Sequence, residues 1–269
     1  MLHYPADSQH PNQKMEESLG VQIFERSNKK VIPTETGATV IASARRILNE
    51  IQQINELAEL AQDPLSGNFR LGAFPTLSTY IFPDLVPAIK QQLPKIRLIL
   101  IEEKTDTLIE QLKQGKLDVA LLSLPINGDT LQYEHLFEDV FKLAVATDHP
   151  LASKKIIKQS DLRQQQLLLL DEGHCLRGQA LQFCQLNGAE EQQDVRATGL
   201  ETLRQMVRAG TGITFIPEIA MRKPDPGICY LSFAEPVPSR NIGLVWRKTS
   251  AKTHLIKQFI SLIKNTANS

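Results

Sequence analysis

The sequence predicts an α/β fold in which two lobes follow a long helix. Three observations support this prediction: a heptad pattern of apolar residues near the N-terminus, two blocks of alternating β-like and helical runs, and a final strand and helix. With 269 residues, of which 42% are hydrophobic, the chain can build one large core or two smaller ones. The 30 basic and 30 acidic residues cancel, so a nucleic-acid surface would have to be a local patch.

A long helix is predicted from Thr36 onward. Its small or apolar residues recur at alternating spacings of four and three, at Val40, Ala44, Ile47, Ile51, Ile54, Ala58 and Ala61. This heptad seam favours winding against a second helix; the alternative is an amphipathic helix packed on a core. The Asp-Pro-Leu-Ser-Gly segment at 63–67 predicts the end of the helix and a hinge.

The first block after the hinge alternates β-like and helical runs. The runs are Phe69–Phe74, Leu77–Gln92, Ile96–Ile101, Thr107–Gln114 and Val119–Leu124. Such alternation predicts a parallel sheet with crossover helices.

The second block starts near Phe141 and repeats the pattern. Its runs are Leu167–Leu170, the helix Leu176–Asn187, Val195, the helix Leu200–Ala209 and Ile213–Ile216, before the last strand Ile242–Trp246 and the last helix Thr253–Lys264. Gly188 and Gly210 fit helix ends. We therefore predict a linker helix and hinge at 37–66, lobe I at 67–139 plus 244–269, lobe II at 140–243, and a ligand cleft between the lobes.

The cysteine content indicates a reducing compartment. Three cysteines are too few for the disulfide framework of a secreted protein. The segment Met1–Lys14 is polar and lacks the apolar core of a signal peptide, and no apolar run is long enough for a membrane span. A cytoplasmic location is expected.

No phosphate-binding loop, zinc-binding helix or nucleophile elbow is present, so we predict neither an enzyme nor a metal or other cofactor.

Two N-terminal segments resemble a known family. Leu19–Arg26 and Val31–Gly37 are similar to the wing of the LysR-type transcriptional regulators, in which a linker helix leads to a two-lobed domain like that of periplasmic binding proteins. The resemblance covers nearly everything from Glu16 onward. It implies a partial winged helix-turn-helix at 1–36, activation at promoter DNA, contact with RNA polymerase, and a homodimer or homotetramer. Three further segments are similar to the peroxide-sensing members: Cys175–Cys184, Leu200–Pro217 and Ile242–Trp246.

The recognition helix of that family is not recognisable in Met1–Lys14. Pro5–Lys14 can be encoded so that reading from the second base gives Pro-Pro-Thr-Leu-Ser-Thr-Gln-Ile-Lys, which resembles the family's recognition helix. We therefore hypothesise a frameshift upstream of Met15, which sequencing of the upstream DNA would reveal or refute. Arg26, Lys29 and Lys30 on the wing are expected to contact the DNA backbone, which positions a protein without reading bases.

Cys175 and Cys184 are the candidate redox pair. The resemblance implies that Cys175 reacts with hydrogen peroxide, that Cys184 resolves the product into a disulfide, and that a glutaredoxin-type partner reduces it. Cys175 stands at a predicted helix N-terminus, so the helix dipole, His174 and Arg177 are expected to lower its pKa. Nine residues of helix span about 13.5 Å, whereas a disulfide needs Cα atoms within about 7 Å. If both cysteines lie in one helix, pairing them requires remodelling.

The resemblance also implies partners for the peroxide site. Thr76, Thr105 and His174 match groups near the sensing thiol, and Arg240 matches an arginine that interacts with the switch. Each threonine could equally be a helix cap or a turn residue.

Gly178 lies between the two cysteines and bears on the switch. Gly178 departs from the acidic residue of well-known members, and it is expected to weaken the helix and ease remodelling. Cys184 could be a small core hydrophobe, and Cys229 is assigned to packing.

Two functions fit these observations, and two others are disfavoured by them. The leading one is a LysR-type regulator that senses peroxide by thiol chemistry, and the second is a LysR-type regulator that binds a small organic effector between its lobes. A solute-binding protein is disfavoured by the heptad helix, and a thiol peroxidase is disfavoured because nothing suggests rapid turnover.

Overall fold

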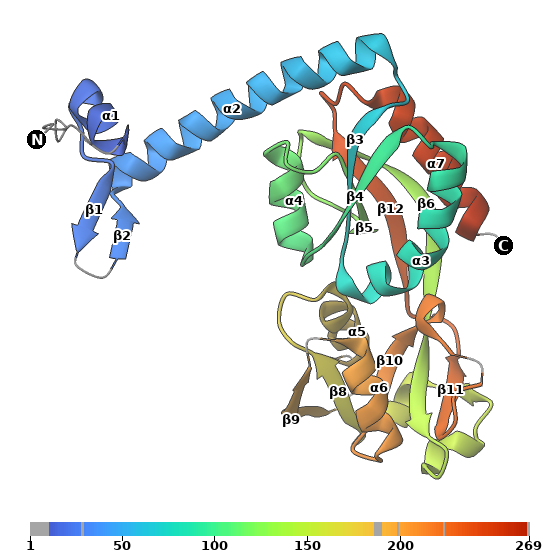
Figure 1. Cartoon of the computed structure of the whole chain (residues 1–269). Helices are drawn as coiled ribbons and strands as arrows, with labels where there is room; N and C mark the ends of the chain where they lie inside the picture. The colour runs from blue at the N-terminus through green and yellow to red at the C-terminus, as the bar shows by residue number, and fades with distance from the viewer. Residues whose placement is uncertain (1–10, 28–29, 186–189, 198, 223, 268–269) are drawn as a thin grey trace, which may run out of the picture. The chain divides into compact units, whose positions relative to one another are not determined.

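The computed structural model describes residues 11–27, 30–185, 190–197, 199–222 and 224–267 (Figure 1). Its contacts divide the chain into two units, 1–55 and 56–269. The first unit contains α1 (Pro11–Leu19), the antiparallel strands β1 (Phe24–Ser27) and β2 (Lys30–Pro33), and most of α2 (Glu35–Gln62). A helix and a hairpin before a long helix are compatible with the predicted partial winged helix-turn-helix. The segment of the proposed frameshift is described only from Pro11 onward.

A small buried contact holds the first unit together. The Glu16 carboxylate accepts hydrogen bonds from the backbone N–H groups of Ile23 and Phe24, at 2.7 and 2.8 Å. Ile23 is fully buried, and a Cβ at Gly37 would lie 1.9 Å from the Ile23 carbonyl oxygen. Only glycine therefore lets α2 approach the chain before β1 this closely.

Lobe I of the second unit is built on parallel strands. These are β3 (Gly67–Ala73), β4 (Ile96–Glu102) and β5 (Val119–Leu124), with α3 (Pro75–Gln92), α4 (Thr105–Lys113) and α7 (Thr253–Ala267) around them. The helices α3 and α7 pack side by side, and α4 covers the other face of the sheet (Figure 1). The parallel sheet predicted for this block is confirmed for β3, β4 and β5.

Lobe II has its own core and shorter elements. Its strands are β7 (Ile156–Ile157), β8 (Gln166–Leu170), β9 (Glu190–Ala197), β10 (Thr214–Pro217) and β11 (Ile228–Phe233); its helices are α5 (Cys175–Gln185) and α6 (Leu200–Arg208), with 3-10 turns η1 (Pro150–Ser153), η2 (Gln159–Leu162) and η3 (Glu218–Ala220). The Asn187 end of the predicted helix lies outside the described residues.

Two long strands connect the lobes. β6 (Leu131–Ala146) and β12 (Ser239–Arg247) pair antiparallel, and each belongs to the eight-stranded sheet whose main order is β4-β3-β5-β12-β6-β11-β7. The eight-stranded sheet as a whole is therefore mixed. In the second block, β8 and β9 pair in parallel as predicted, but in a separate two-stranded sheet, and β10 pairs antiparallel with β6. β6 begins in the core of lobe I and ends in the core of lobe II, so residues near its middle lie between the two lobes.

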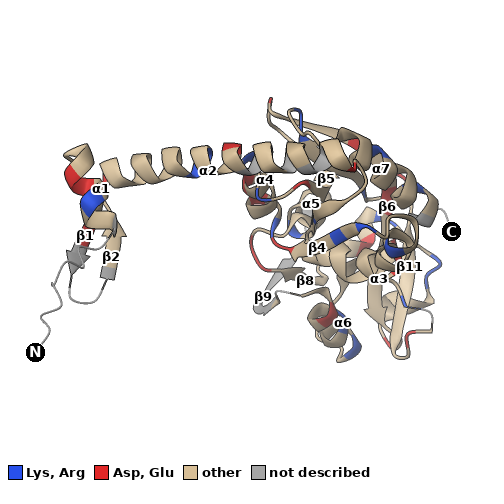
Figure 2. Ribbon diagram, turned by 45° about the horizontal axis from the view of Figure 1, so that its top comes forward, with Lys and Arg blue, Asp and Glu red and all other residues tan. Residues whose placement is uncertain are grey.

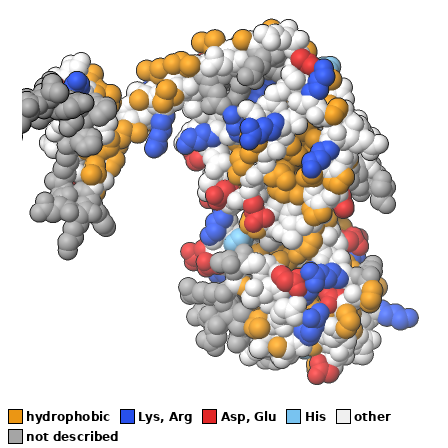
Figure 3. Space-filling view, viewed as in Figure 1, with side chains coloured by type: hydrophobic (Ala, Val, Ile, Leu, Met, Phe, Trp, Pro, Cys, Tyr) orange, Lys and Arg blue, Asp and Glu red, His pale blue; other side chains and the backbone are white. Residues whose placement is uncertain are grey.

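The middle of α2 carries exposed apolar side chains. Ile47, Leu48, Ile51, Ile54 and Leu57 are each between 50% and 64% exposed. Figure 3 shows hydrophobic side chains along this helix. Within the described part of the chain, no helix has both the length and the apolar character needed to cross a membrane.

Candidate functional site

Cys175 is the first residue of α5, at the junction of the two lobes. β8 ends at Leu170, and a short turn with Gly173 at φ +84° leads into the helix. Although α5 belongs to lobe II, the partly buried Cys175 packs against the core of lobe I. The thiol is therefore held where the lobes meet, and a conformational change in α5 would alter the packing of both lobes.

Arg240 is the cation beside the thiol. It is 2% exposed, and its guanidinium donates two hydrogen bonds to Asp139 Oδ2, at 2.9 and 2.8 Å. It also donates to Thr76 Oγ1 at 2.9 Å and to the Thr76 carbonyl at 3.0 Å. The rings of Phe74 and Phe141 lie 5.1 and 5.8 Å from the guanidinium carbon, so the group is fixed from several sides. The structure thus brings together three predicted site residues: Cys175, Thr76 and Arg240.

The electrostatics of Cys175 differ from the prediction. Burial raises the pKa of the thiol, and the charge of Arg240, a backbone N–H group and the Arg240 hydrogen bond oppose this without overcoming it. The expected net lowering of the pKa is therefore wrong. The reason is that packing against lobe I removes water from the thiol, which the position of Cys175 in the helix does not reveal.

His174 and Arg177 do not act as expected on that pKa. Burial first, and then the charge of Lys104, lower the pKa of His174, so its imidazole is neutral near pH 7 and is not a cation for the thiolate. The Arg177 guanidinium donates to the Leu170 carbonyl at 3.2 Å and so ties the first turn of α5 to β8.

Two of the predicted site residues each carry a buried polar atom without a partner. Among the described residues, His174 Nε2 and Thr105 Oγ1 accept and donate no hydrogen bond. Such atoms are costly unless something binds them. His174 also lines a cleft of about 470 Å³, whose other side is formed by Pro75, Lys104 and neighbouring residues of lobe I. The cleft is large enough for a small polar molecule.

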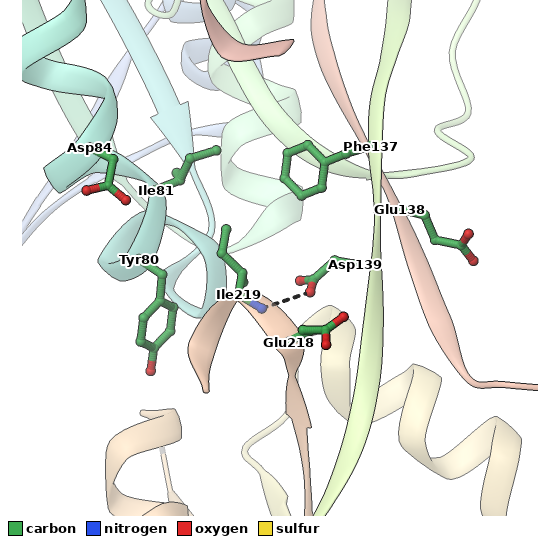
Figure 4. A pocket seen from close by; sticks show the side chains of 8 residues that line it. All are labelled: Tyr80, Ile81, Asp84, Phe137, Glu138, Asp139, Glu218 and Ile219. Atoms are coloured by element: carbon green, nitrogen blue, oxygen red, sulfur yellow. Dashed lines mark hydrogen bonds between the residues drawn. The ribbon is translucent and has the colours of Figure 1, made fainter. Parts of the chain in front are cut away.

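Asp139 was missed by sequence reasoning. It is 3% exposed, and its Oδ1 accepts a hydrogen bond from the Ile219 N–H at 3.2 Å while Oδ2 holds Arg240. Figure 4 shows the hydrogen bond between Ile219 and Asp139 in a second pocket of about 320 Å³, which is also lined by Tyr80 of α3. A buried carboxylate near the middle of a long strand has no local sequence signature, because its partner lies 101 residues away.

The helix geometry at the cysteine pair is as predicted. Cys175 and Cys184 both lie within the continuous helix α5, so nine residues of rise separate them. The side chain of Cys184 lies outside the described residues. Gly178 is exposed, and a Cβ there would meet nothing within 4 Å. Cys229 packs at the edge of the lobe II core, in agreement with its assignment to packing.

The predicted DNA-backbone residues cannot be placed as side chains. Arg26 and Lys30 lie on β1 and β2, but their side chains, and all of Lys29, fall outside the described residues. Among the described residues of the second unit, basic and acidic side chains occur on several different elements (Figure 2).

Comparisons with known proteins agree on one family. Residues 62–268 match the LysR substrate binding domain. The DNA-binding transcriptional dual regulator OxyR of Escherichia coli strain K12 is 38% identical over 270 residues, which cover 96% of this chain and 88% of that protein. A full-length OxyR variant of Pseudomonas aeruginosa is 33% identical, with a TM-score of 0.75, over 94% of this chain and 83% of that one. The oxidised form of OxyR is 38% identical, with a TM-score of 0.69, over 77% and 99% of the two chains.

Proposed function

Because this chain belongs to the LysR-type regulators and is close to OxyR, we propose that it activates oxidative-stress genes in response to hydrogen peroxide, with Cys175 and Cys184 as its reversible switch. The observation that carries this proposal is the placement of both cysteines on one helix whose first residue packs on the other lobe. A disulfide between them requires α5 to be dismantled, and that change releases the lobe contact.

The chemistry proceeds in two balanced steps. The Cys175 thiolate attacks one peroxide oxygen, the O–O bond breaks, and the products are a sulfenic acid and hydroxide. The Cys184 thiol then attacks the sulfenic sulfur, which forms the disulfide and releases water. A glutaredoxin-type thiol partner supplies the electrons that restore both thiols. Because such cycling needs a reducing compartment, the protein is proposed to act in the cytoplasm.

We assign the surrounding groups separate roles. Arg240 favours the thiolate. Thr76 accepts hydrogen bonds from the Arg240 guanidinium and so fixes the position of that group. The unpartnered atoms of Thr105 and His174 are suited to hydrogen-bond a peroxide and its leaving oxygen. Arg177 holds the first turn of α5 in the dithiol state.

The N-terminal part of the chain is proposed to act on promoter DNA together with RNA polymerase. The exposed apolar side chains of α2 suit pairing with the same helix of a second copy, as in a homodimer or homotetramer. The β1–β2 hairpin would place Arg26, Lys29 and Lys30 on DNA phosphates, contacts that position a protein on DNA without reading its bases.

The test is mass mapping of the reduced full chain after treatment with stoichiometric peroxide. We expect a Cys175–Cys184 disulfide in the wild type and in Cys229→Ser. Cys184→Ser should instead accumulate a sulfenic acid at Cys175 that a dimedone-type reagent traps. No disulfide in the wild type would overturn the switch and leave a regulator that binds a small effector in the 470 Å³ cleft.

Gly178→Ala is expected to oppose oxidation. The position is exposed and open, so the methyl group fits, and alanine stabilises a helix by up to about 1 kcal/mol over glycine. A more stable α5 favours the dithiol, so the equilibrium constant for disulfide formation should fall by up to about fivefold. A glutathione redox titration measures this constant. An equal or larger constant in Gly178→Ala would show that helix stability does not limit the switch.

A further inference from the structure

Lys104 of lobe I reaches across to the turn that precedes the cysteine helix. It is the residue before α4, and its Nζ donates a hydrogen bond of 2.7 Å to the carbonyl oxygen of Glu172 in lobe II. The two residues are 68 positions apart in the sequence, so this contact exists only because the lobes meet here.

The turn is shaped to receive that side chain. Gly173 has φ +84°, which disfavours other residues, and a Cβ built on it would lie 3.0 Å from Lys104 Cδ and 3.3 Å from Nζ. The stem of Lys104 thus lies against the bare glycine while its ammonium binds the neighbouring carbonyl. Packing and hydrogen bonding act on the same two turn residues.

The turn leads directly into the reactive site. His174, which follows Gly173, is 8% exposed, and Cys175 comes next as the first residue of α5. Any movement of the turn therefore moves the buried imidazole and the thiol. The ammonium of Lys104 also contributes, after burial, to lowering the pKa of His174, so it acts on the chemistry of the site as well as on its geometry.

We propose, on the basis of the Cys175–Cys184 switch, that Lys104 is a positioning residue that holds the Glu172–Gly173 turn on lobe I in the dithiol state. Oxidation dismantles the start of α5 and breaks this hydrogen bond. A contact present only in the dithiol form stabilises that form alone. Lys104 therefore sets how readily the two cysteines pair.

The test compares Lys104→Met with the wild type in the full chain. Methionine keeps the apolar stem over Gly173 and removes the ammonium. In a glutathione titration we expect disulfide formation to be favoured three- to tenfold, where tenfold equals about 30 mV for a two-electron couple. Lys104→Arg keeps a donor and should stay closer to the wild type.

The matched control is Lys113→Met, at the C-terminal end of α4. Lys113 pairs only with the exposed Glu110 of its own helix among the contacts described for it, so its loss should leave the titration unchanged. If Lys104→Met and Lys113→Met titrate alike, the proposal is wrong.

Hydrogen exchange separates this proposal from the switch itself. In the reduced protein, amides of residues 172–176 should exchange faster in Lys104→Met than in Lys113→Met. If the wild type forms no Cys175–Cys184 disulfide, the switch fails, and the exchange rates alone decide whether Lys104 holds the turn. Faster exchange in Lys104→Met than in Lys113→Met supports this role, and equal exchange overturns it.

Discussion

Arg240→Met is expected to slow the oxidation of Cys175 by hydrogen peroxide by about 10- to 100-fold. A hydrogen bond to a charged group contributes about 1.5–3 kcal/mol, and each 1.36 kcal/mol is about tenfold in rate. Burial already raises the pKa of the thiol, and Arg240 is the side chain that opposes this. Without it the pKa rises further, and a smaller fraction of thiolate is present at neutral pH.

The measurement is the pH profile of Cys175 alkylation and of its oxidation. In the wild type both rates should increase with pH up to the pKa of the thiol, and in Arg240→Met the profile should shift to higher pH. Arg240→Lys keeps a charge but loses the planar fork, so an intermediate profile is expected.

A second variant guards against misfolding. Arg240→Met alone leaves Asp139 buried and unpaired, which destabilises a protein strongly. Arg240→Met combined with Asp139→Asn removes the unpaired charge. A folded double variant that reacts with peroxide at the wild-type rate would exclude a role for Arg240 in activating the thiol.

The sequence predicts the site best where the determinants are local. The Asp-Pro step after α2 ends the helix as expected, because Pro64 cannot continue it and Asp63 accepts a hydrogen bond from the Leu65 N–H. The start of α5 is predicted to within one residue, and with it the distance along the helix that separates Cys175 from Cys184. Fixed helix geometry makes that inference independent of the rest of the fold.

The determinants that the sequence does not reveal are contacts between distant segments. Asp139 meets Arg240 across 101 residues, and Lys104 meets Glu172 across 68, through a lobe arrangement that no local pattern encodes. The pKa of Cys175 fails for the same reason. The helix N-terminus is visible in the sequence, but the burial that outweighs it comes from the core of lobe I.

Lobe II depends on a second buried ion pair, and this one is expected to control acid stability. Asp225 is 2% exposed at its side chain and accepts hydrogen bonds from Arg204 at 2.9 Å, Arg208 at 2.6 Å and the Tyr230 hydroxyl. Arg204 is fully buried and keeps Glu201 as its other carboxylate. Asp225→Ala should therefore lower the free energy of unfolding by about 3 kcal/mol, the lower end for breaking a buried pair.

The pH dependence of that loss has a definite sign. Burial raises the pKa of Asp225, but the hydrogen bonds of its three partners lower it by more, so the pKa in the folded state lies below the unfolded value of about 3.9. The stabilisation is complete above the unfolded pKa and is lost as the pH falls through the folded pKa. Urea unfolding from pH 7 to pH 2 measures the free energy of unfolding of the wild type and of Asp225→Asn. The difference between the two free energies should shrink as the pH falls. Glu110→Ala, which removes an exposed pair, should change stability by no more than about 1 kcal/mol. A gap between wild type and Asp225→Asn that stays constant down to pH 2 would mean that the carboxylate charge is not what holds Arg204 in the core.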